Sequence, residues 1–151
     1  MNNLKVLLIE DGEYKSKRVM DFLNEELGVK SVVLKQSYSS AVKELVKGSY
    51  DFAIIDMSLP TFDQFPGEVS DDFRAFGGLD IARQIKRRSI NLKFVFLTQY
   101  QSLTDDNNSM DISDINKFAT ENYDEKYLGC IYYEHSGSQW KEELKEVIVN
   151  G

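Results

Sequence analysis

The chain has 151 residues, a length typical of one domain, and 42% of them are hydrophobic, which is enough to form a substantial core. Its 25 acidic and 18 basic residues give a formal net charge of −7, and a surface with that balance repels phosphate backbones, which argues against direct binding to nucleic acid. No apolar run approaches the roughly 20 residues of a membrane-spanning helix, and no secretory signal is visible after Met1. The single cysteine, Cys130, excludes an internal disulfide and a cysteine-cluster metal site, and is typical of a reducing cytoplasm, where we expect the protein to act.

Buried strands alternate with amphipathic helices along the sequence. In chain order, the predicted elements are a strand at 5–9, a helix through 19–27 that ends at Gly28, a strand at 31–34, a helix through 41–46 that ends at Gly48, a strand at 52–55, a helix through 78–85, a strand at 94–97, a weaker helix at 112–120, a strand at 128–133 and a last helix through 140–148. Ser39 or Ser40 is the expected N-cap of the second helix. Strands that alternate with helices in this way predict an α/β fold, with a mostly parallel sheet and helices on both faces, in a single domain over residues 1–151.

Two segments fit no regular pattern. Residues 61–77 mix four phenylalanines, at 62, 65, 73 and 76, with the acids Asp63, Glu68, Asp71 and Asp72. Because structureless loops of this length are uncommon in compact domains, the segment is either a functional lid or docking surface, or a surface loop whose phenylalanines pack locally. A second, polar stretch covers residues 104–109.

Polar residues end three of the buried strands: Glu10 and Asp11 the first, Asp56 the third, and Thr98 the fourth. In doubly wound sheets, ligands bind at the carboxyl ends of the strands. Three carboxylates gathered there repel one another, and oxygen ligands without nearby His or Cys favour Mg²⁺. An aspartate can also attack phosphorus to form an aspartyl phosphate. The alternative is that these acids only cap helices or face solvent.

The sequence resembles the receiver domains of two-component response regulators over nearly its whole length. The matching segments are Lys5-Val-Leu-Leu-Ile-Glu-Asp11, Tyr50-Asp-Phe-Ala-Ile-Ile-Asp-Met-Ser-Leu-Pro60, Gly78-Leu-Asp-Ile-Ala-Arg-Gln-Ile85 and Phe94-Val-Phe-Leu-Thr-Gln-Tyr100. The resemblance implies a flavodoxin-like fold with five strands, Mg²⁺ as cofactor, and Asp56 as the phosphoacceptor. It further implies that Glu10, Asp11, Asp56 and the backbone carbonyl of Ser58 bind the metal, that Thr98 is the switch hydroxyl, and that Tyr100 is the switch aromatic.

The sequence departs from the family at the end of the fifth strand, where the resemblance leads us to expect a lysine followed by proline. Residues 127–140 contain no Lys or Arg. Lys126 precedes the strand and lies at its wrong end, whereas His135 is either a hydrogen-bond donor near the site or, in the more ordinary case, an exposed loop residue. Because this charge is missing from the last strand, we expect weaker phosphoryl binding or only a partial conformational response. A lysine introduced at Tyr132 or Tyr133 should enlarge that conformational response.

Three functions compete. The first is a Mg²⁺-dependent phosphoacceptor that receives its phosphoryl group from a sensor histidine kinase or phosphotransfer protein and contacts a downstream protein target, without nucleic acid or membrane. The second is a pseudo-receiver, a protein-interaction module that is not phosphorylated, which the missing lysine favours. The third is a metal-dependent phosphohydrolase; such an enzyme needs a general acid two residues beyond the acceptor, where this chain has Ser58. We rank them in this order, and expect a signalling module rather than an enzyme.

Overall fold

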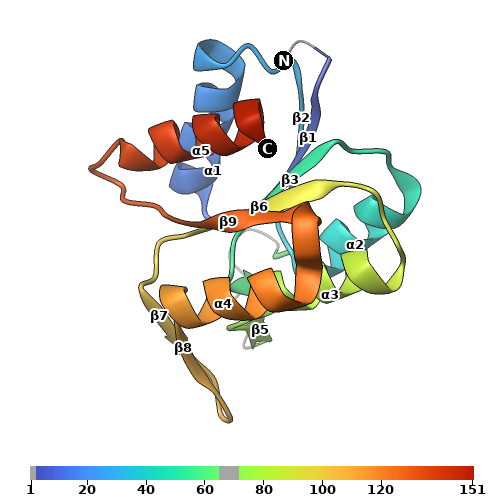
Figure 1. Cartoon of the computed structure of the whole chain (residues 1–151), viewed down its shortest axis with the longest axis vertical. Coiled ribbons are helices and arrows are strands. Elements are labelled where there is room, and N and C mark those ends of the chain that lie inside the picture. The colour runs from blue at the N-terminus through green and yellow to red at the C-terminus, as the bar shows by residue number, and fades with distance from the viewer. Residues whose placement is uncertain (1–2, 65–71) are drawn as a thin grey trace.

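A parallel sheet of five strands forms the centre of the computed structural model, which describes residues 3–64 and 72–151 (Figure 1). The strand order is β2-β1-β3-β6-β9. These strands are β1 (Lys5–Ile9), β2 (Ser31–Lys35), β3 (Phe52–Ile55), β6 (Lys93–Thr98) and β9 (Tyr127–Tyr132). The predicted α/β class and the five-stranded, flavodoxin-like arrangement are thereby confirmed.

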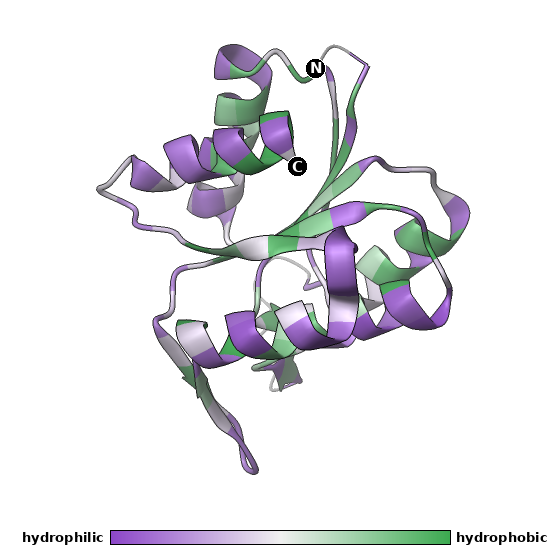
Figure 2. Cartoon of the chain, viewed as in Figure 1, coloured by the Kyte–Doolittle hydropathy of each residue, from purple (hydrophilic) through white to green (hydrophobic). Residues whose placement is uncertain are grey.

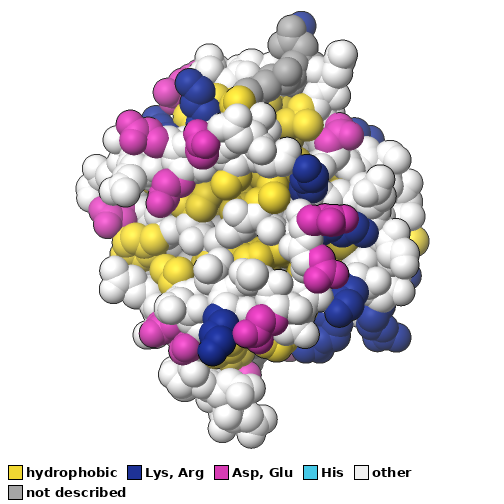
Figure 3. Space-filling model, viewed as in Figure 1, with side chains coloured by type: hydrophobic (Ala, Val, Ile, Leu, Met, Phe, Trp, Pro, Cys, Tyr) yellow, Lys and Arg dark blue, Asp and Glu magenta, His cyan; other side chains and the backbone are white. Residues whose placement is uncertain are grey.

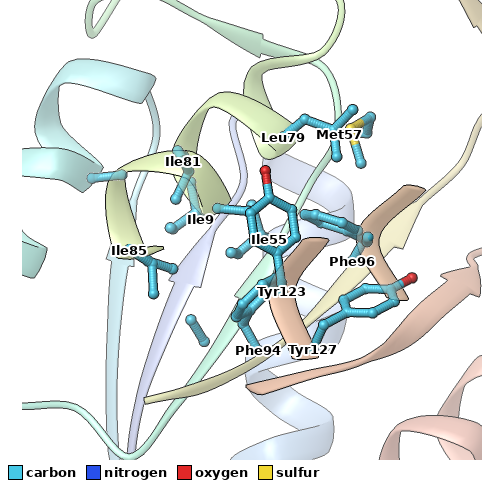
Figure 4. Close-up of a cluster of buried hydrophobic side chains, with 14 of the residues drawn as sticks. Ile9, Ile55, Met57, Leu79, Ile81, Ile85, Phe94, Phe96, Tyr123 and Tyr127 are labelled. Atoms are coloured by element: carbon cyan, nitrogen blue, oxygen red, sulfur yellow. The ribbon is translucent and has the colours of Figure 1, made fainter. Parts of the chain in front are cut away.

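Helices cover both faces of the sheet (Figure 1). The bounds are α1 (Glu13–Asp21), extended by a π-helical turn at Phe22–Glu26, α2 (Tyr38–Lys47), α3 (Gly77–Arg87), α4 (Ile112–Tyr123), followed by a 3₁₀ turn at Asp124–Lys126, and α5 (Gln139–Asn150). α2, α3 and α4 pack on one face, around side chains such as Ile55, Phe94 and Phe96 (Figure 4). α1 and α5 pack on the other, where Trp140 lies against Phe22.

The colouring by hydropathy shows the strands of the sheet as mainly hydrophobic and the helices as mixed, as expected for strands buried on both faces (Figure 2). β9 lies at one edge of the sheet, between α4 and α5, and hydrophobic side chains are visible in the strip between these two helices (Figure 3). Among the described residues, no helix combines the length and the apolar character needed to cross a membrane.

Local chemistry accounts for most helix ends. Gly28 has a φ of 69°, a left-handed conformation that favours glycine, and the turn closes with a hydrogen bond from Val29 N–H to the Leu23 carbonyl, as predicted for a C-terminal cap. The expected N-cap of α2 was wrong by a few residues. Ser37, rather than Ser39 or Ser40, caps the helix, and its hydroxyl accepts from the N–H of Ser40 while the Ser40 hydroxyl accepts from the N–H of Ser37.

Short antiparallel strand pairs that the sequence pattern did not predict lie at both irregular segments. At the first, β4 (Leu59–Pro60), just before the segment, pairs with β5 (Phe73–Arg74). Phe65, Glu68 and Asp71 lie outside the described residues, whereas Phe62 and Phe73 are exposed. In the second, β7 (Ser102–Thr104) pairs with β8 (Ser109–Asp111), and this hairpin projects from the body of the fold (Figure 1).

The strand order and the strand register together bring Glu10 and Asp56 to the same end of the sheet. β1 lies between β2 and β3, so the chain turns to opposite sides of β1 after the first and second helices. Ile9 pairs with Ile55 and Ile55 with Phe96, so that Glu10 and Asp56 directly follow neighbouring strands at the same end of the sheet. This is the switch point at which ligands bind in doubly wound sheets.

Candidate functional site

The predicted acidic cluster forms at the carboxyl end of the sheet. Glu10, Asp11 and Asp56 each offer a carboxylate oxygen, and these atoms lie within 4.8 Å of one another. Glu10 and Asp56 are buried, whereas Asp11 is partly exposed. Two backbone N–H groups hold the carboxylates in place: Gly12 N–H donates to Glu10 Oε2 at 2.9 Å, and Met57 N–H donates to Asp56 Oδ1 at 2.8 Å.

A lysine that the sequence analysis did not select lies inside this cluster. The side chain of Lys15, from the first turns of α1, is only 3% exposed. Its Nζ lies 2.7 Å from Glu10 Oε1 and 3.2 Å from Asp56 Oδ1, and it donates to the Leu97 carbonyl at 2.6 Å. The last strand has no lysine at its end, as the sequence shows, but α1 supplies a buried ammonium group to the cluster.

The electrostatics of the cluster favour a cation. Burial is the main cause that raises the pKa of the Asp11 carboxyl to about 6, and the neighbouring Glu10 adds to it. Burial also raises the pKa of the Asp56 carboxyl, an effect that Lys15 opposes. For Lys15, burial lowers the pKa of the ammonium, but attraction to Asp56 and Glu10 outweighs it and the pKa is raised. Lys15 can neutralise one of the three carboxylates, so the cluster stays net negative when all three are ionised.

The end of β9 carries an aromatic group where the resemblance leads us to expect a lysine. Tyr133 is buried, and the centroid of its ring lies 5.4 Å from Lys15 Nζ, within the range of a cation–π contact. Arg18 donates to the Tyr133 hydroxyl at 3.2 Å and to the His135 carbonyl at 2.6 Å. His135 is exposed and packs edge-on against Tyr133, while Lys126 donates to the Ile90 carbonyl. Among the described residues, no hydrogen bond or ion pair joins His135 or Lys126 to the carboxylates.

The predicted switch residues lie one strand away. Thr98 ends β6 and is buried, and its hydroxyl accepts a hydrogen bond of 3.2 Å from the N–H of Tyr100. Tyr100 itself is 44% exposed, and its hydroxyl accepts from the Gln99 side chain. Ser58, two residues beyond Asp56, is partly buried. The structure thus brings Glu10, Asp11 and Asp56 together, with Thr98 and Ser58 on neighbouring segments, and leaves Tyr100 at the surface.

The donor set suits Mg²⁺. All three ligands are carboxylates, and no His or Cys belongs to the cluster found among the described residues. Hard oxygen donors of this kind, few enough for the ion to keep several waters, are typical of magnesium sites that also bind a phosphate. Glu10, Asp11 and Asp56 would hold the ion.

Comparisons with known proteins agree with this geometry. The chain is 25% identical over 146 residues to the Detocs response regulatory protein DtcB of Vibrio alginolyticus, an alignment that covers 95% of this chain and 98% of that protein. The receiver domain of Francisella response regulator 1452 matches 97% of this chain and 95% of its own, with a TM-score of 0.63 and 17% identity. The chain therefore has the fold of response-regulator receiver domains and is similar in sequence to a response regulatory protein over nearly its whole length. No family model matches it.

A second solved structure bears on the ligand. Response regulator TrrA of Thermotoga maritima, in complex with Mg²⁺-BeF, matches 95% of this chain and 98% of its own, with a TM-score of 0.55 and 17% identity. At 17% identity this likeness shows the fold of the chain alone.

A signal for Lys15 was present in the sequence. The buried stripe of α1 and its π-helical extension contains Val19, Phe22 and Leu23, and Lys15 lies four residues before Val19, on the same helical face. A buried ammonium group without a partner is energetically very costly. A lysine on the buried face of α1, just after the acidic residues that end β1, is therefore expected to pair with those carboxylates.

Proposed function

We propose that this receiver domain accepts a phosphoryl group on Asp56, with Mg²⁺ bound by Glu10, Asp11, Asp56 and the backbone carbonyl of Ser58, and that it signals through protein contacts in a phosphorelay. The observation that carries the proposal is the convergence of three carboxylates, with oxygens within 4.8 Å, at the carboxyl ends of adjacent strands. The carboxylates of such a cluster repel one another, and a bound cation offsets that repulsion.

The chemistry follows from the environment of Asp56. A carboxylate oxygen attacks phosphorus, a P–O bond forms, and the bond from phosphorus to the donor group breaks, with the leaving group taking the electron pair. Bound Mg²⁺ supplies charge neutralisation for the phosphoryl oxygens. Burial of Asp56 keeps bulk water from the carboxylate, and the hydrogen bond from Met57 N–H fixes its orientation.

The switch would pass through Thr98 and Tyr100. If the Thr98 hydroxyl turns toward a phosphoryl group on Asp56, its hydrogen bond from Tyr100 N–H is lost or weakened. The exposed Tyr100 ring is then free to move inward, which changes the surface beside the β7–β8 hairpin. The expected partners are a sensor histidine kinase or phosphotransfer protein on the input side and a downstream protein target on the output side.

A pseudo-receiver remains the second candidate, and one observation favours it. Lys15 already bridges Glu10 and Asp56, so the site carries an internal cation before any metal binds. If that cation replaces Mg²⁺ altogether, the domain would bind partners without being phosphorylated. The phosphohydrolase reading has weaker support, since the position two residues beyond Asp56 is Ser58, which cannot serve as a carboxylic general acid.

Intact-mass measurement after incubation with acetyl phosphate and Mg²⁺ tests the proposal. Wild type should gain the mass of one phosphoryl group, and the gain should disappear in Asp56→Asn and when Mg²⁺ is chelated. Asp51→Asn is the matched control, because Asp51 is an exposed aspartate at the opposite end of the same strand. Modification that persists in Asp56→Asn would show that the acceptor is another residue, and an unmodified wild type would favour the pseudo-receiver.

A further inference from the structure

Lys15 is the cationic side chain at the phosphoacceptor, and its position suggests a role that neither the resemblance nor the comparisons assign. Its ammonium has three N–H donors and three oxygen partners: Glu10 Oε1, Asp56 Oδ1 and the Leu97 carbonyl. In the described part of the chain, Lys15 is the only Lys or Arg that forms an ion pair with Asp56.

The other candidate cation of this region is engaged elsewhere. Arg18, one turn further along α1, donates to the Tyr133 hydroxyl and to the carbonyls of Glu134, His135 and Gly137. These hydrogen bonds hold the segment that follows β9 and engage the guanidinium there. Tyr133, in turn, places its ring against the Lys15 ammonium.

We propose that Lys15 is the residue that binds the phosphoryl group on Asp56, so that the first helix supplies the charge-assisted contact that the last strand lacks. This inference rests on the proposed function. Both hydrogen bonds recorded for the Asp56 carboxylate in the described residues go to Oδ1, from Lys15 and from Met57 N–H. Oδ2 is therefore the oxygen available to attack phosphorus, and the new phosphoryl oxygens arise within reach of the ammonium.

The step balances without a proton transfer. With acetyl phosphate as donor, Asp56 Oδ2 forms a bond to phosphorus, the bond between phosphorus and the acetate oxygen breaks, and acetate leaves with the electron pair. Lys15 stays an ammonium throughout, and exchanges carboxylate oxygens for phosphoryl oxygens as partners. Its carbonyl partner, Leu97, immediately precedes Thr98, so a shift of the ammonium acts directly on the end of β6.

The competing role for Lys15 is that of a permanent substitute for the metal ion. The two roles predict different behaviour of Lys15→Met, in which the side chain stays long and unbranched but loses its charge. If Lys15 binds the phosphoryl group, the substitution should weaken phosphoryl binding and leave the binding of Mg²⁺ alone unaffected. If Lys15 substitutes for the metal ion, it blocks Mg²⁺, and the substitution should allow Mg²⁺ to bind. Lys17→Met is the matched control, because Lys17 lies on the same helix, is 76% exposed and pairs only with Asp21 among the described residues.

Calorimetric titration with MgCl₂ alone, and then with beryllofluoride in saturating Mg²⁺, separates these outcomes. We expect Lys15→Met to bind beryllofluoride at least tenfold more weakly than wild type and Lys17→Met, the loss that corresponds to one charge-assisted hydrogen bond. The affinity for Mg²⁺ alone should be similar in wild type and Lys15→Met. The rate of phosphorylation by acetyl phosphate, followed by intact mass, should fall in parallel.

A double variant guards against a simple folding defect. In Lys15→Met/Tyr133→Lys the charge returns from the end of β9, and beryllofluoride binding should recover at least in part. Equal beryllofluoride affinity in wild type and Lys15→Met would overturn the role of Lys15 while leaving phosphorylation of Asp56 intact. Wild type that binds neither Mg²⁺ nor beryllofluoride, combined with Lys15→Met that binds Mg²⁺, would instead identify Lys15 as the metal substitute and overturn the proposed function.

Discussion

Gly78 lies in helix α3 against the backbone of Asp56 and Met57, and replacing it with alanine should destabilise the fold. Its N–H donates to the Met57 carbonyl at 2.8 Å, and an added Cβ would lie 2.8 Å from the Asp56 carbonyl oxygen and 3.0 Å from Met57 Cα. These are backbone atoms, so relief requires a movement of the main chain. Overpacking of this kind costs about 1–3 kcal/mol, while the helix preference of alanine over glycine returns at most about 1 kcal/mol.

We therefore expect Gly78→Ala to lower the free energy of unfolding by about 1–2 kcal/mol, which corresponds to a fall in Tm of about 2–8 °C for a domain of this size. Urea and thermal unfolding measure both quantities. Gly137→Ala is the control, since its added Cβ would meet mainly the side chain of Glu134, which is exposed and can move. A Gly78→Ala variant as stable as wild type would refute the reasoning, because it would mean that α3 and the loop after β3 separate without cost.

Two further predictions concern other parts of the chain. Asp111→Ala should lower the free energy of unfolding by about 1 kcal/mol in urea, because Asp111 caps α4 by accepting from Asp114 N–H at 2.8 Å, and an Asp106→Ala control should change it far less. Burial raises the pKa of the Cys130 thiol to about 12, so alkylation by iodoacetamide at pH 8 should be slow in the folded protein and should accelerate as the pH rises toward that pKa. Alkylation should become fast when urea unfolds the protein. Equally fast alkylation of the folded protein at pH 8 would contradict this prediction.

The sheet and its main helices were predictable because their signals are local and strong. Continuous apolar runs such as Lys5–Ile9 and Phe52–Ile55 are typical of strands buried on both faces, and the observed strands begin and end within one or two residues of the predicted ones. Gly28 ends its helix where expected, because only a left-handed residue closes that turn at low cost.

The short antiparallel pairs were not predictable in the same way. β4 and β5 have two residues each and are separated by more than ten residues of chain, so their pairing depends on tertiary contacts rather than on any periodicity. The β7–β8 hairpin turns through polar residues, where Asp105 accepts from the N–H groups of Asn107 and Asn108. Such turn chemistry becomes recognisable as a hairpin only when the flanking strands alternate clearly, and three residues on each side are too few.

The candidate site likewise contains residues that the sequence pattern predicts and one that it does not. Its carboxylates follow buried strands, so their convergence could be predicted from the topology alone. Lys15 reaches the cluster from a helix, and whether its side chain points inward depends on how α1 packs against the sheet. The buried stripe through Val19 and Phe22 indicates that orientation, whereas the family resemblance implies a lysine at the end of β9, where the chain has Tyr132 and Tyr133.

Addition of Mg²⁺ should stabilise the wild-type protein, and Asp11→Asn should remove most of that effect. Among the proposed metal ligands Asp11 is the most informative to replace, because it is partly exposed and forms no ion pair with Lys15 in the described structure. Its replacement therefore leaves the ion pairs of Lys15 with Glu10 and Asp56 intact. For a dissociation constant on the order of 1 mM, about 10 mM Mg²⁺ adds roughly 1.4 kcal/mol to the free energy of unfolding. Thermal unfolding at matched ionic strength measures this, with Asp106→Asn as an acid-to-amide control on the exposed turn of the β7–β8 hairpin. If wild type and Asp11→Asn gain the same stability from Mg²⁺, the ion binds outside the cluster, and the Lys15 ammonium is then the only cation that the carboxylates hold.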